Sequence, residues 1–227
     1  VIYMEEVPDE CECQFFMRSM APDLNSSGVR GVVASRINSK QSQNDEVIKG
    51  IRFEDYRDES QLDQIMRLVG EDLSEPYSIF TYRYFLHSFP DLGIFAISED
   101  SNQPIGCVVC KIDGVETNEG VESDAFGGNK GDEKPIGYMA MLAVDKNYRR
   151  LGIGTALVER AVGRMKEKGC VSVTLETEVS NKAAMKLYEE RLGFIREDLL
   201  VRYYLNWGDA YRLRLWLDND DFISNSS

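Results

Sequence analysis

The spacing of apolar residues along the chain predicts four helices and six strands. Apolar positions recur at helical intervals over residues 60–73, 77–89, 155–168 and 180–192. Shorter apolar or alternating runs are typical of strands and cover residues 93–98, 105–112, 136–144, 171–176, 199–205 and 210–217. The chain order is therefore helix, helix, three strands, helix, strand, helix and two strands. This order predicts one α/β domain over residues 50–217.

Polar residues and glycines mark where the predicted helices begin and end. Ser60 is a candidate N-cap for the first helix, and Ser180 or Asn181 for the last. Pro90 ends the second helix, because proline cannot donate the next backbone hydrogen bond. Gly169 follows the third helix at the position where a left-handed residue is common.

Three polar stretches flank or interrupt the predicted domain. Residues 1–49 are expected to be a disordered leader, because Ser, Asn, Gln, Gly and Asp dominate much of it and bury too little apolar area to offset ordering entropy. Residues 113–134 hold seven acidic residues against two lysines, which predicts an acidic loop insertion. Residues 218–227 are expected to form an acidic polar tail.

Composition excludes several classes of protein. The 39 acidic and 26 basic residues give a net charge of −13, which argues against a non-specific DNA or RNA binder. No run approaches the length of a membrane span, and residues 1–6 lack the features of a secretory signal. The odd count of five cysteines favours a reducing compartment. His87 is the single histidine, so a multi-histidine metal centre is excluded. We expect it to be a helix-surface or half-buried residue.

Two of the predicted strands carry polar or reactive residues at regular spacing. Cys107 and Cys110 form a C-x-x-C pair, but residues three apart on a strand point to opposite faces, so we expect neither a zinc nor a redox site. Over residues 210–217, leucines alternate with Arg212, Arg214 and Trp216. That alternation predicts a strand with one apolar face and one polar face.

The turn between the strand at 136–144 and the helix at 155–168 carries the clearest chemical signal. It contains Arg149, Arg150, Gly152 and Gly154. Glycines allow a ligand to approach the backbone closely, and the amides at a helix N-terminus bind phosphate groups. The two arginines add positive charge where a pyrophosphate would lie. The turn therefore predicts a site for a phosphate-bearing ligand.

Two nucleotide ligands compete for this turn. A Rossmann dinucleotide site needs a third glycine, but Leu157 occupies that position, although Glu176 lies at a suitable distance for the ribose. The predicted order also lacks repeated βαβ units. A Walker phosphate loop is excluded, because no Gly-Lys-Ser/Thr follows.

The second ligand is coenzyme A. Residues 149–154 resemble the R/Q-x-x-G-x-G/A pyrophosphate loop of the GNAT acetyltransferases. Beyond the loop, the LSEPYS segment at 73–78 and the RYYLN segment at 202–206 resemble the catalytic subunit of the N-terminal acetyltransferase NatC, as do residues 137–144, 175–178 and 184–188. The resemblance covers roughly residues 51–217. One departure is the segment after Tyr188, which is one residue longer than the family's usual pattern and bears on the helix phase there.

The resemblance implies a GNAT fold, with a mixed, mostly antiparallel sheet splayed around acetyl-CoA between its fourth and fifth strands and with flanking helices. It implies that pantetheine pairs with the backbone of Leu142, Ala143 and Val144. Asn181 and Tyr188 would approach the cosubstrate from the other side. The pyrophosphate would rest on Arg149, Arg150, Leu151, Gly152, Ile153, Gly154 and Thr155. No metal is implied.

The resemblance also implies an acyl transfer with two catalytic residues. Glu176 would act as the general base, through water, on the substrate's α-amine, and Tyr188 would protonate the departing sulfur. An α-amine has a pKa of about 7.7–8.0 in solution, so a carboxylate of raised pKa is a suitable base.

A peptide is expected to enter between the first two helices and the final hairpin. The family acts on N-termini that begin with Met followed by a bulky hydrophobic residue: Met-Leu, Met-Ile, Met-Phe and Met-Trp. The residues implied to bind this substrate are Glu75, Tyr77, Tyr138, Tyr203 and Tyr204. Phe80, on the same aromatic stripe as Tyr77, is expected to pack in the core.

By the same resemblance, the chain is expected to act in the cytoplasm, near the ribosome, with a large auxiliary subunit and a small Sm-like one. It would modify nascent protein N-termini and bind neither nucleic acid directly nor a membrane. Aromatic residues of the helix at 77–89 are a candidate part of the subunit interface. The alternatives are a stand-alone N-terminal or lysine acetyltransferase and a non-catalytic acetyl-CoA-binding subunit.

Overall fold

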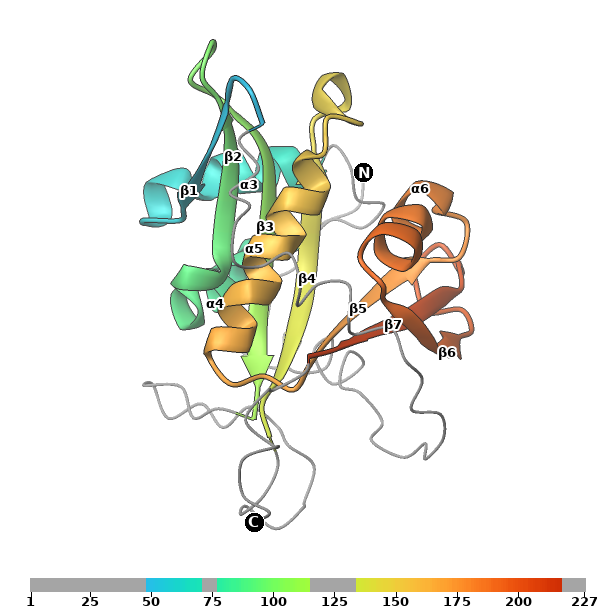
Figure 1. Ribbon diagram of the computed structural model, residues 1–227. Coiled ribbons are helices and arrows are strands. Elements are labelled where there is room, and N and C mark those ends of the chain that lie inside the picture. The colour runs from blue at the N-terminus through green and yellow to red at the C-terminus, as the bar shows by residue number, and fades with distance from the viewer. Residues whose placement is uncertain (1–47, 71–76, 115–133, 218–227) are drawn as a thin grey trace, which may run out of the picture.

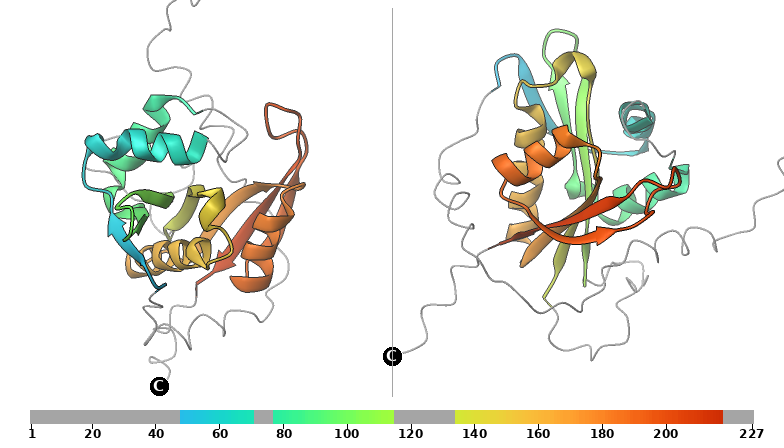
Figure 2. Two further views of the ribbon diagram at one scale, coloured as in Figure 1. Left: turned by 90° about the horizontal axis from the view of Figure 1, so that it is seen from above. Right: turned by 90° about the vertical axis from the view of Figure 1, so that its right-hand side faces the viewer.

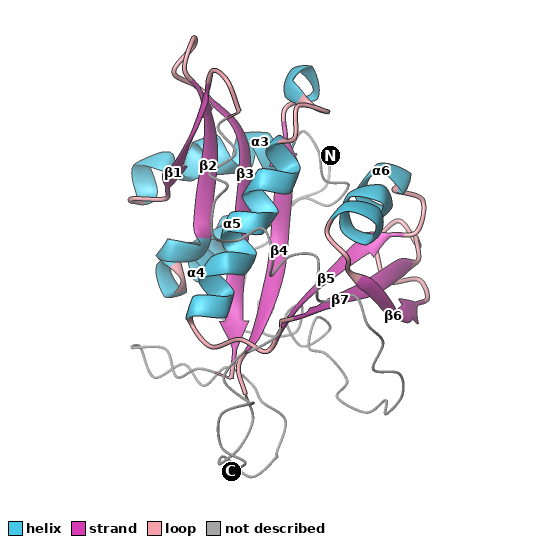
Figure 3. Cartoon of the chain, in the orientation of Figure 1, coloured by secondary structure: helices cyan, strands magenta, loops and turns pink. Residues whose placement is uncertain are grey.

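The structure is a computed structural model that describes residues 48–70, 77–114 and 134–217. In this part of the chain, one seven-stranded sheet has the order β1-β2-β3-β4-β5-β7-β6 (Figures 1 and 3). The strands are β1 (Ile51–Asp55), β2 (Gly93–Ser98), β3 (Pro104–Asp113), β4 (Ile136–Val144), β5 (Ser172–Glu178), β6 (Ile195–Leu200) and β7 (Ala210–Trp216). Their neighbours are antiparallel except β4 and β5, so the predicted mixed, mostly antiparallel α/β sheet is confirmed.

Helices cover both faces of the sheet. α3 (Leu62–Gly70) and α4 (Ile79–Ser88) lie on one face, and α5 (Ile153–Glu167) lies on the other (Figure 2). α6 (Lys182–Met185) continues into a π-helical turn, η4 (Lys186–Arg191), on the α5 side. Short 3-10 turns complete the set: η1 (Glu59–Gln61), η2 (Pro90–Leu92) and η3 (Lys146–Tyr148). Each face of the sheet has its own apolar core.

Cysteine side chains illustrate the two-sided sheet. Cys107 is buried in the core under α3 and α4, whereas Cys110 is buried in the core under α5. The two thiols therefore lie on opposite faces of β3, as the strand period predicts. Burial raises the pKa of the Cys110 thiol, which keeps it protonated and unreactive.

The predicted elements differ from the structure mainly at the sheet edges. β1 was not predicted, and the strand predicted at 199–205 lies earlier, at Ile195–Leu200. Both are edge strands, and β6 is exposed along almost its whole length, so its sequence shows no apolar alternation. The predicted N-cap Ser60 is also wrong: Asp58 caps the turn by accepting a hydrogen bond from the Ser60 amide.

β4 and β5 form the splay that positions the site. Their parallel pairing covers only Ile136–Ser172, Gly137–Val173 and Tyr138–Thr174, after which the strands separate. α5 packs closely against β4 at the base of this splay. The contact is so close that a β-carbon on Gly137 would lie 2.3 Å from the Met165 sulfur. The residues of β4 beyond Tyr138 pair with β3 on one edge, and no strand in the described ranges pairs with their other edge. The predicted splay between the fourth and fifth strands is confirmed.

Several expectations concern residues outside the described ranges. These are residues 1–47 of the expected leader, residues 115–133 of the expected insertion, the tail at 218–227, and Glu75. Among the residues that are described, none of the helices is both long and apolar enough to cross a membrane. The same residues hold no cluster of three or more His, Cys, Asp or Glu side chains arranged to bind a metal ion.

Candidate active site

Glu176 lies at the centre of the candidate site, on β5 where the sheet opens. Its Oε1 atom accepts a hydrogen bond from Arg212 Nε at 2.9 Å, and its Oε2 atom accepts one from Tyr138 Oη at 2.9 Å. The Glu176 and Arg212 side chains are only 5% and 7% exposed. The carboxylate is therefore held by donors from β4 on one side and β7 on the other.

Burial is the largest influence on the pKa of Glu176. Removal from water raises the pKa of the Glu176 carboxyl, and the Arg212 guanidinium and the Tyr138 hydroxyl oppose that rise in part. The net direction is upward, so Glu176 is a stronger base than a carboxylate in water. The ion pair in turn raises the pKa of Arg212, whose positive charge is retained.

Tyrosines from three parts of the chain surround this carboxylate. Tyr138 comes from β4 and Tyr203 from the β6–β7 loop, and Tyr77 precedes the N-cap of α4. Tyr77 interacts electrostatically with both other tyrosines. Tyr203 and Tyr204 meet edge to face at 5.2 Å. Burial raises the pKa values of the Tyr138 and Tyr203 hydroxyls, so both remain protonated donors. Four of the five residues predicted to bind peptide are thus described, and three of them gather near Glu176.

The Tyr203 hydroxyl is an exception to the rule that buried polar groups are satisfied. Among the described residues, its oxygen is the one buried side-chain N or O atom that has no hydrogen-bond partner. A buried unsatisfied hydroxyl is costly, and such groups are often found where a ligand completes the set of partners.

Tyr188 reaches the splay from the opposite face of the sheet. Its ring is buried against Phe194 at 5.5 Å, and its hydroxyl lies 4.0 Å from the sulfur of Met139 on β4. Tyr188 is part of η4, where the Leu192 amide bonds to the Leu187 carbonyl five residues earlier at 3.2 Å. This longer hydrogen-bonding step takes up the additional residue that the sequence shows after Tyr188.

A bulge in β4 lies directly beside these contacts. Val109 pairs with Met141 and Cys110 pairs with Met139, which leaves Ala140 as the extra residue. Such bulges bend a strand and redirect side chains, and they are common next to active sites. Here the bulge separates Tyr138 and Met139, which contact the two candidate catalytic residues, from the backbone of residues 142–144.

The turn that precedes α5 has the geometry expected of an anion-binding loop. Gly152 adopts a φ of 88° and Arg150 a φ of 66°, and α5 begins at Ile153. Among the residues that the structure describes, no side chain caps this helix, so its first amides are available to an anion. Arg149 Nε donates to the Val144 carbonyl at 3.0 Å, which ties the turn to the end of β4. The chain here fits a phosphate-bearing cosubstrate.

The other predicted cosubstrate contacts lie on β4 and at the start of α6. Leu142, Ala143 and Val144 are on the part of β4 that has separated from β5, and Asn181 precedes α6. Asn181 Oδ1 accepts a hydrogen bond from the Ala184 amide at 3.0 Å, so this side chain also caps the helix. The predicted site residues thus line the opening of the sheet and the helices beside it.

The burial of three residues differs from what the sequence suggested. Arg212 and Arg214 alternate with leucines along the strand and were expected on its polar face, but both are buried. Phe80 was expected in the core, but it is 61% exposed. The signal for Arg212 was available as an arginine inside a strand of alternating leucines, but its partner could not be found without the strand register.

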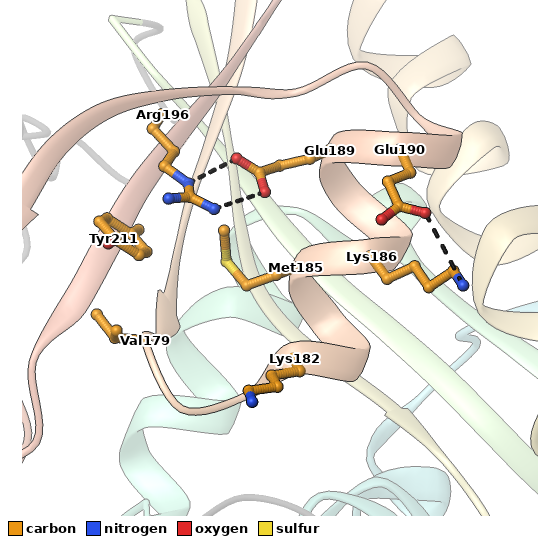
Figure 4. A pocket seen from close by; sticks show the side chains of 8 residues that line it. All are labelled: Val179, Lys182, Met185, Lys186, Glu189, Glu190, Arg196 and Tyr211. Atoms are coloured by element: carbon orange, nitrogen blue, oxygen red, sulfur yellow. Dashed lines mark hydrogen bonds and ion pairs between the residues drawn. The ribbon is translucent and has the colours of Figure 1, made fainter.

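A hollow of about 510 Å³ lies away from Glu176, between α6, η4 and the β6–β7 hairpin (Figure 4). Arg196 pairs with Glu189 there, and Lys186 pairs with Glu190. Tyr211 contributes to it, and because Tyr211 and Arg212 are consecutive on β7, their side chains face opposite ways. None of the predicted site residues that the structure describes lines this hollow.

Comparison with known proteins gives the family. The sequence profile of the acetyltransferase (GNAT) family matches residues 62–194. The chain belongs to this GNAT family. Its relatives within the family include N-alpha-acetyltransferase 30 of Homo sapiens, 49% identical over 74% of this chain and 41% of that protein. The corresponding protein of Saccharomyces cerevisiae is 45% identical over 71% of this chain and 84% of its own length.

Solved structures agree with this placement. A crystal structure of the NatC complex bound to Gag peptide and CoA contains a chain that is 42% identical, with a TM-score of 0.64, over 74% of this chain and 99% of that one. Ard1 from Thermoplasma volcanium has a TM-score of 0.61 at 19% identity, which supports the GNAT fold alone. The predicted GNAT fold and the resemblance to the NatC catalytic subunit are confirmed. The chain spans about half the length of its Xenopus laevis and human relatives, at 57% and 41%.

Proposed function

We propose that this GNAT chain is an N-alpha-acetyltransferase and the catalytic subunit of a NatC-type complex. It transfers an acetyl group from acetyl-CoA to the α-amine of proteins that begin with Met followed by a bulky hydrophobic residue. The observation that carries the proposal is the meeting of two sets of residues at the splay. Glu176 with its tyrosines lies on one face, and Tyr188 with the helix-α5 turn lies on the other.

In the proposed reaction Glu176 is the general base. Its raised pKa suits removal of one proton, through water, from an amine whose own pKa is about 7.7–8.0. Nitrogen then forms a bond to the acetyl carbon, and the carbon–sulfur bond breaks. Tyr188, on the other face of β4, gives its proton to the departing sulfur. The backbone of residues 142–144 and the amides at the start of α5 hold the cosubstrate.

Substrate choice is assigned to the tyrosines around Glu176. Tyr77, Tyr138 and Tyr203 provide apolar ring surface with hydroxyl donors at its edge. Such a surface suits a methionine side chain and an apolar second residue, because sulfur and methylene groups pack well on aromatic rings. Tyr204 supports Tyr203 through their edge-to-face contact, and Glu75 is assigned to the same path.

The proposed setting is a cytoplasmic complex at the ribosome, with a large and a small Sm-like auxiliary subunit. Support comes from the similar chain in a NatC complex structure and from the exposure of Phe80 at the start of α4. An exposed phenylalanine of this kind is a candidate contact for an auxiliary subunit.

A peptide panel tests the proposal. Peptides beginning Met-Leu, Met-Ile, Met-Lys, Met-Asp and Ser-Glu are incubated with acetyl-CoA and the chain, alone and with auxiliary subunits. We expect Met-Leu and Met-Ile to be preferred, and Glu176→Gln to lose most of that activity. Glu197→Gln is the matched control, because Glu197 also pairs with a buried arginine of β7, at 2.7 Å, but lies outside the site.

Two outcomes would overturn the proposal in different ways. Preference for an internal lysine over every α-amine would favour a lysine acetyltransferase. Binding of acetyl-CoA without turnover of any peptide, even with auxiliary subunits present, would favour a non-catalytic acetyl-CoA-binding subunit.

A further inference from the structure

We propose that Arg212 is a positioning residue for the reaction, which fixes the orientation of the Glu176 carboxylate and keeps that carboxylate charged. The inference rests on the proposed function and deepens it, because it adds a residue that acts on the base and does not touch the substrate. Arg212 was not among the residues implied by the resemblance.

The first argument is geometric. Glu176 and Arg212 are direct cross-strand partners in the pairing of β5 with β7. Arg212 Nε binds one carboxylate oxygen and Tyr138 Oη binds the other, each at 2.9 Å. Two donors from different strands prevent the carboxylate from rotating. The oxygens therefore present a fixed set of lone pairs at the mouth of the splay.

The second argument concerns charge. A carboxylate that is 5% exposed loses most of its hydration, and without compensation it would take up a proton and cease to be a base. The groups around Glu176 come from several elements: Arg212 on β7, Tyr138 on β4, Lys111 on β3 and Tyr203 in the β6–β7 loop. Of these, Lys111 is already paired with Asp113 at 2.6 Å. Arg212 is thus the cation in direct contact with the carboxylate.

The third argument comes from comparison within the same strand. Arg214 lies two residues from Arg212 and is equally buried, and it forms two hydrogen bonds to Glu197 and one to Ser172. That pair joins β7 to β6 and β5 without reaching the splay. Arg214 therefore provides a matched control for the structural cost of removing a buried arginine from β7.

The test compares the pH dependence of kcat for wild type, Arg212→Met, Arg212→Lys and Arg214→Met, each in the complex with a Met-Leu peptide. Removing a positive charge in contact with a carboxylate raises the carboxylate's pKa by about 1–3 pH units. We expect the acidic limb of the Arg212→Met profile to move to higher pH by that amount. Arg212→Lys keeps the charge and is expected to retain most of the wild-type position. Arg214→Met is expected to leave the limb in place.

A double variant separates positioning from a general loss of structure. If Arg212 acts through Glu176, Arg212→Met has little further effect on kcat in a Glu176→Gln background. The KM for acetyl-CoA is expected to change by less than about twofold, since Arg212 does not contact the α5 turn. Should Arg212→Met fail to fold, Arg212→Gln removes the charge and leaves a polar side chain beside Glu176, with Arg212→Lys as its charged counterpart.

The failure of this inference and the failure of the proposed function give different results. An unmoved acidic limb in a folded Arg212 variant, with Glu176→Gln inactive, would overturn the positioning role alone. The positioning role would also be overturned if Arg212→Met lowered kcat by the same factor in the Glu176→Gln background as in wild type. Full activity of Glu176→Gln would instead overturn the assignment of the base itself.

Discussion

Glu176 and Tyr188 approach the same point of β4 from opposite faces of the sheet. The Tyr138 hydroxyl donates a hydrogen bond to Glu176, and the next residue, Met139, contacts the hydroxyl of Tyr188. Consecutive residues of a strand point to opposite faces, so Glu176 and Tyr188 can act on one substrate only where β4 and β5 have separated. An acceptor from the α3–α4 face and a donor from the α5 face can meet at this opening.

The assignment of Glu176 as base predicts a specific pH dependence. Because burial raises the pKa of this carboxyl, activity is present above that raised pKa and is lost as pH falls through it. Glu176→Gln is expected to lower kcat by about 10²–10⁴-fold and to remove this limb. Steady-state kinetics over a pH series measures both effects. Retention of the acidic limb in the glutamine variant would assign it to another group.

The buried pair predicts non-additive effects on stability. Glu176→Met or Arg212→Met alone leaves one uncompensated buried charge, which costs about 3–5 kcal/mol of the free energy of unfolding. The double variant Glu176→Met/Arg212→Met is expected to be more stable than either single one, because no charge remains buried. Urea unfolding of all four proteins gives the coupling energy. Simple addition of the two losses would show that the residues do not stabilise each other.

Two glycines of the α5 turn are expected to respond differently to alanine. Gly152 has a φ of 88°, so Gly152→Ala forces a left-handed alanine at a cost of about 1–2 kcal/mol and distorts the turn. Gly154 is not in that region, and a β-carbon there would meet Leu187 and Val144 at 3.5 and 3.9 Å, which is ordinary contact. Gly154→Ala is therefore expected to keep its stability within about 0.5 kcal/mol.

The KM for acetyl-CoA then distinguishes ligand contact from folding. Gly152→Ala is expected to raise the KM for acetyl-CoA and to lower stability as well. A raised KM in Gly154→Ala without a loss of stability would show that the ligand approaches the backbone closely there. An unchanged KM in both variants, measured beside thermal unfolding, would contradict a cosubstrate site at this turn.

The unpartnered hydroxyl of Tyr203 predicts a separation of stability from substrate binding. Tyr203→Phe removes a buried oxygen that has no hydrogen-bond partner among the described residues, so the stability of the variant is expected to stay the same or rise slightly. If the hydroxyl binds the peptide, the KM for a Met-Leu peptide rises by about 5–30-fold. This factor corresponds to the loss of one hydrogen bond that contributes about 1–2 kcal/mol. Thermal unfolding and peptide kinetics check the two parts. A destabilised variant with normal KM would assign the hydroxyl a structural role.

The contact of Tyr188 with Met139 predicts which step depends on its hydroxyl. Tyr188→Phe keeps the ring that packs on Phe194 and removes only the proposed proton donor. We expect kcat to fall by about 10²-fold or more, with the KM for peptide little changed. Met139→Leu, which removes the sulfur near the hydroxyl, serves as the packing control. Normal kcat in Tyr188→Phe would exclude it as the acid.

Local patterns in the sequence identified the elements that carry the site. β2 and β4 were predicted at their observed bounds, because both are continuous apolar runs bounded by turn residues. The two glycines and two arginines before α5 indicated a phosphate-binding turn, since the chemistry is contained within a few consecutive residues. β1 was not predicted and β6 was predicted too late in the chain. Both are edge strands, and an exposed edge strand such as β6 lacks a buried face that would impose alternation.

The sequence by itself determined the side-chain types, the order of the elements between β2 and β5, the turn before α5 and the family resemblance, all of which depend on residues close together in the chain. Only the tertiary structure decided that Arg212 lies against Glu176, that Tyr203 has a buried hydroxyl without a partner, and that Phe80 faces outward. Glu176 is 36 residues from Arg212 and 38 from Tyr138. Contacts over such separations follow from strand register and from where β4 and β5 part, which packing of both faces of the sheet establishes.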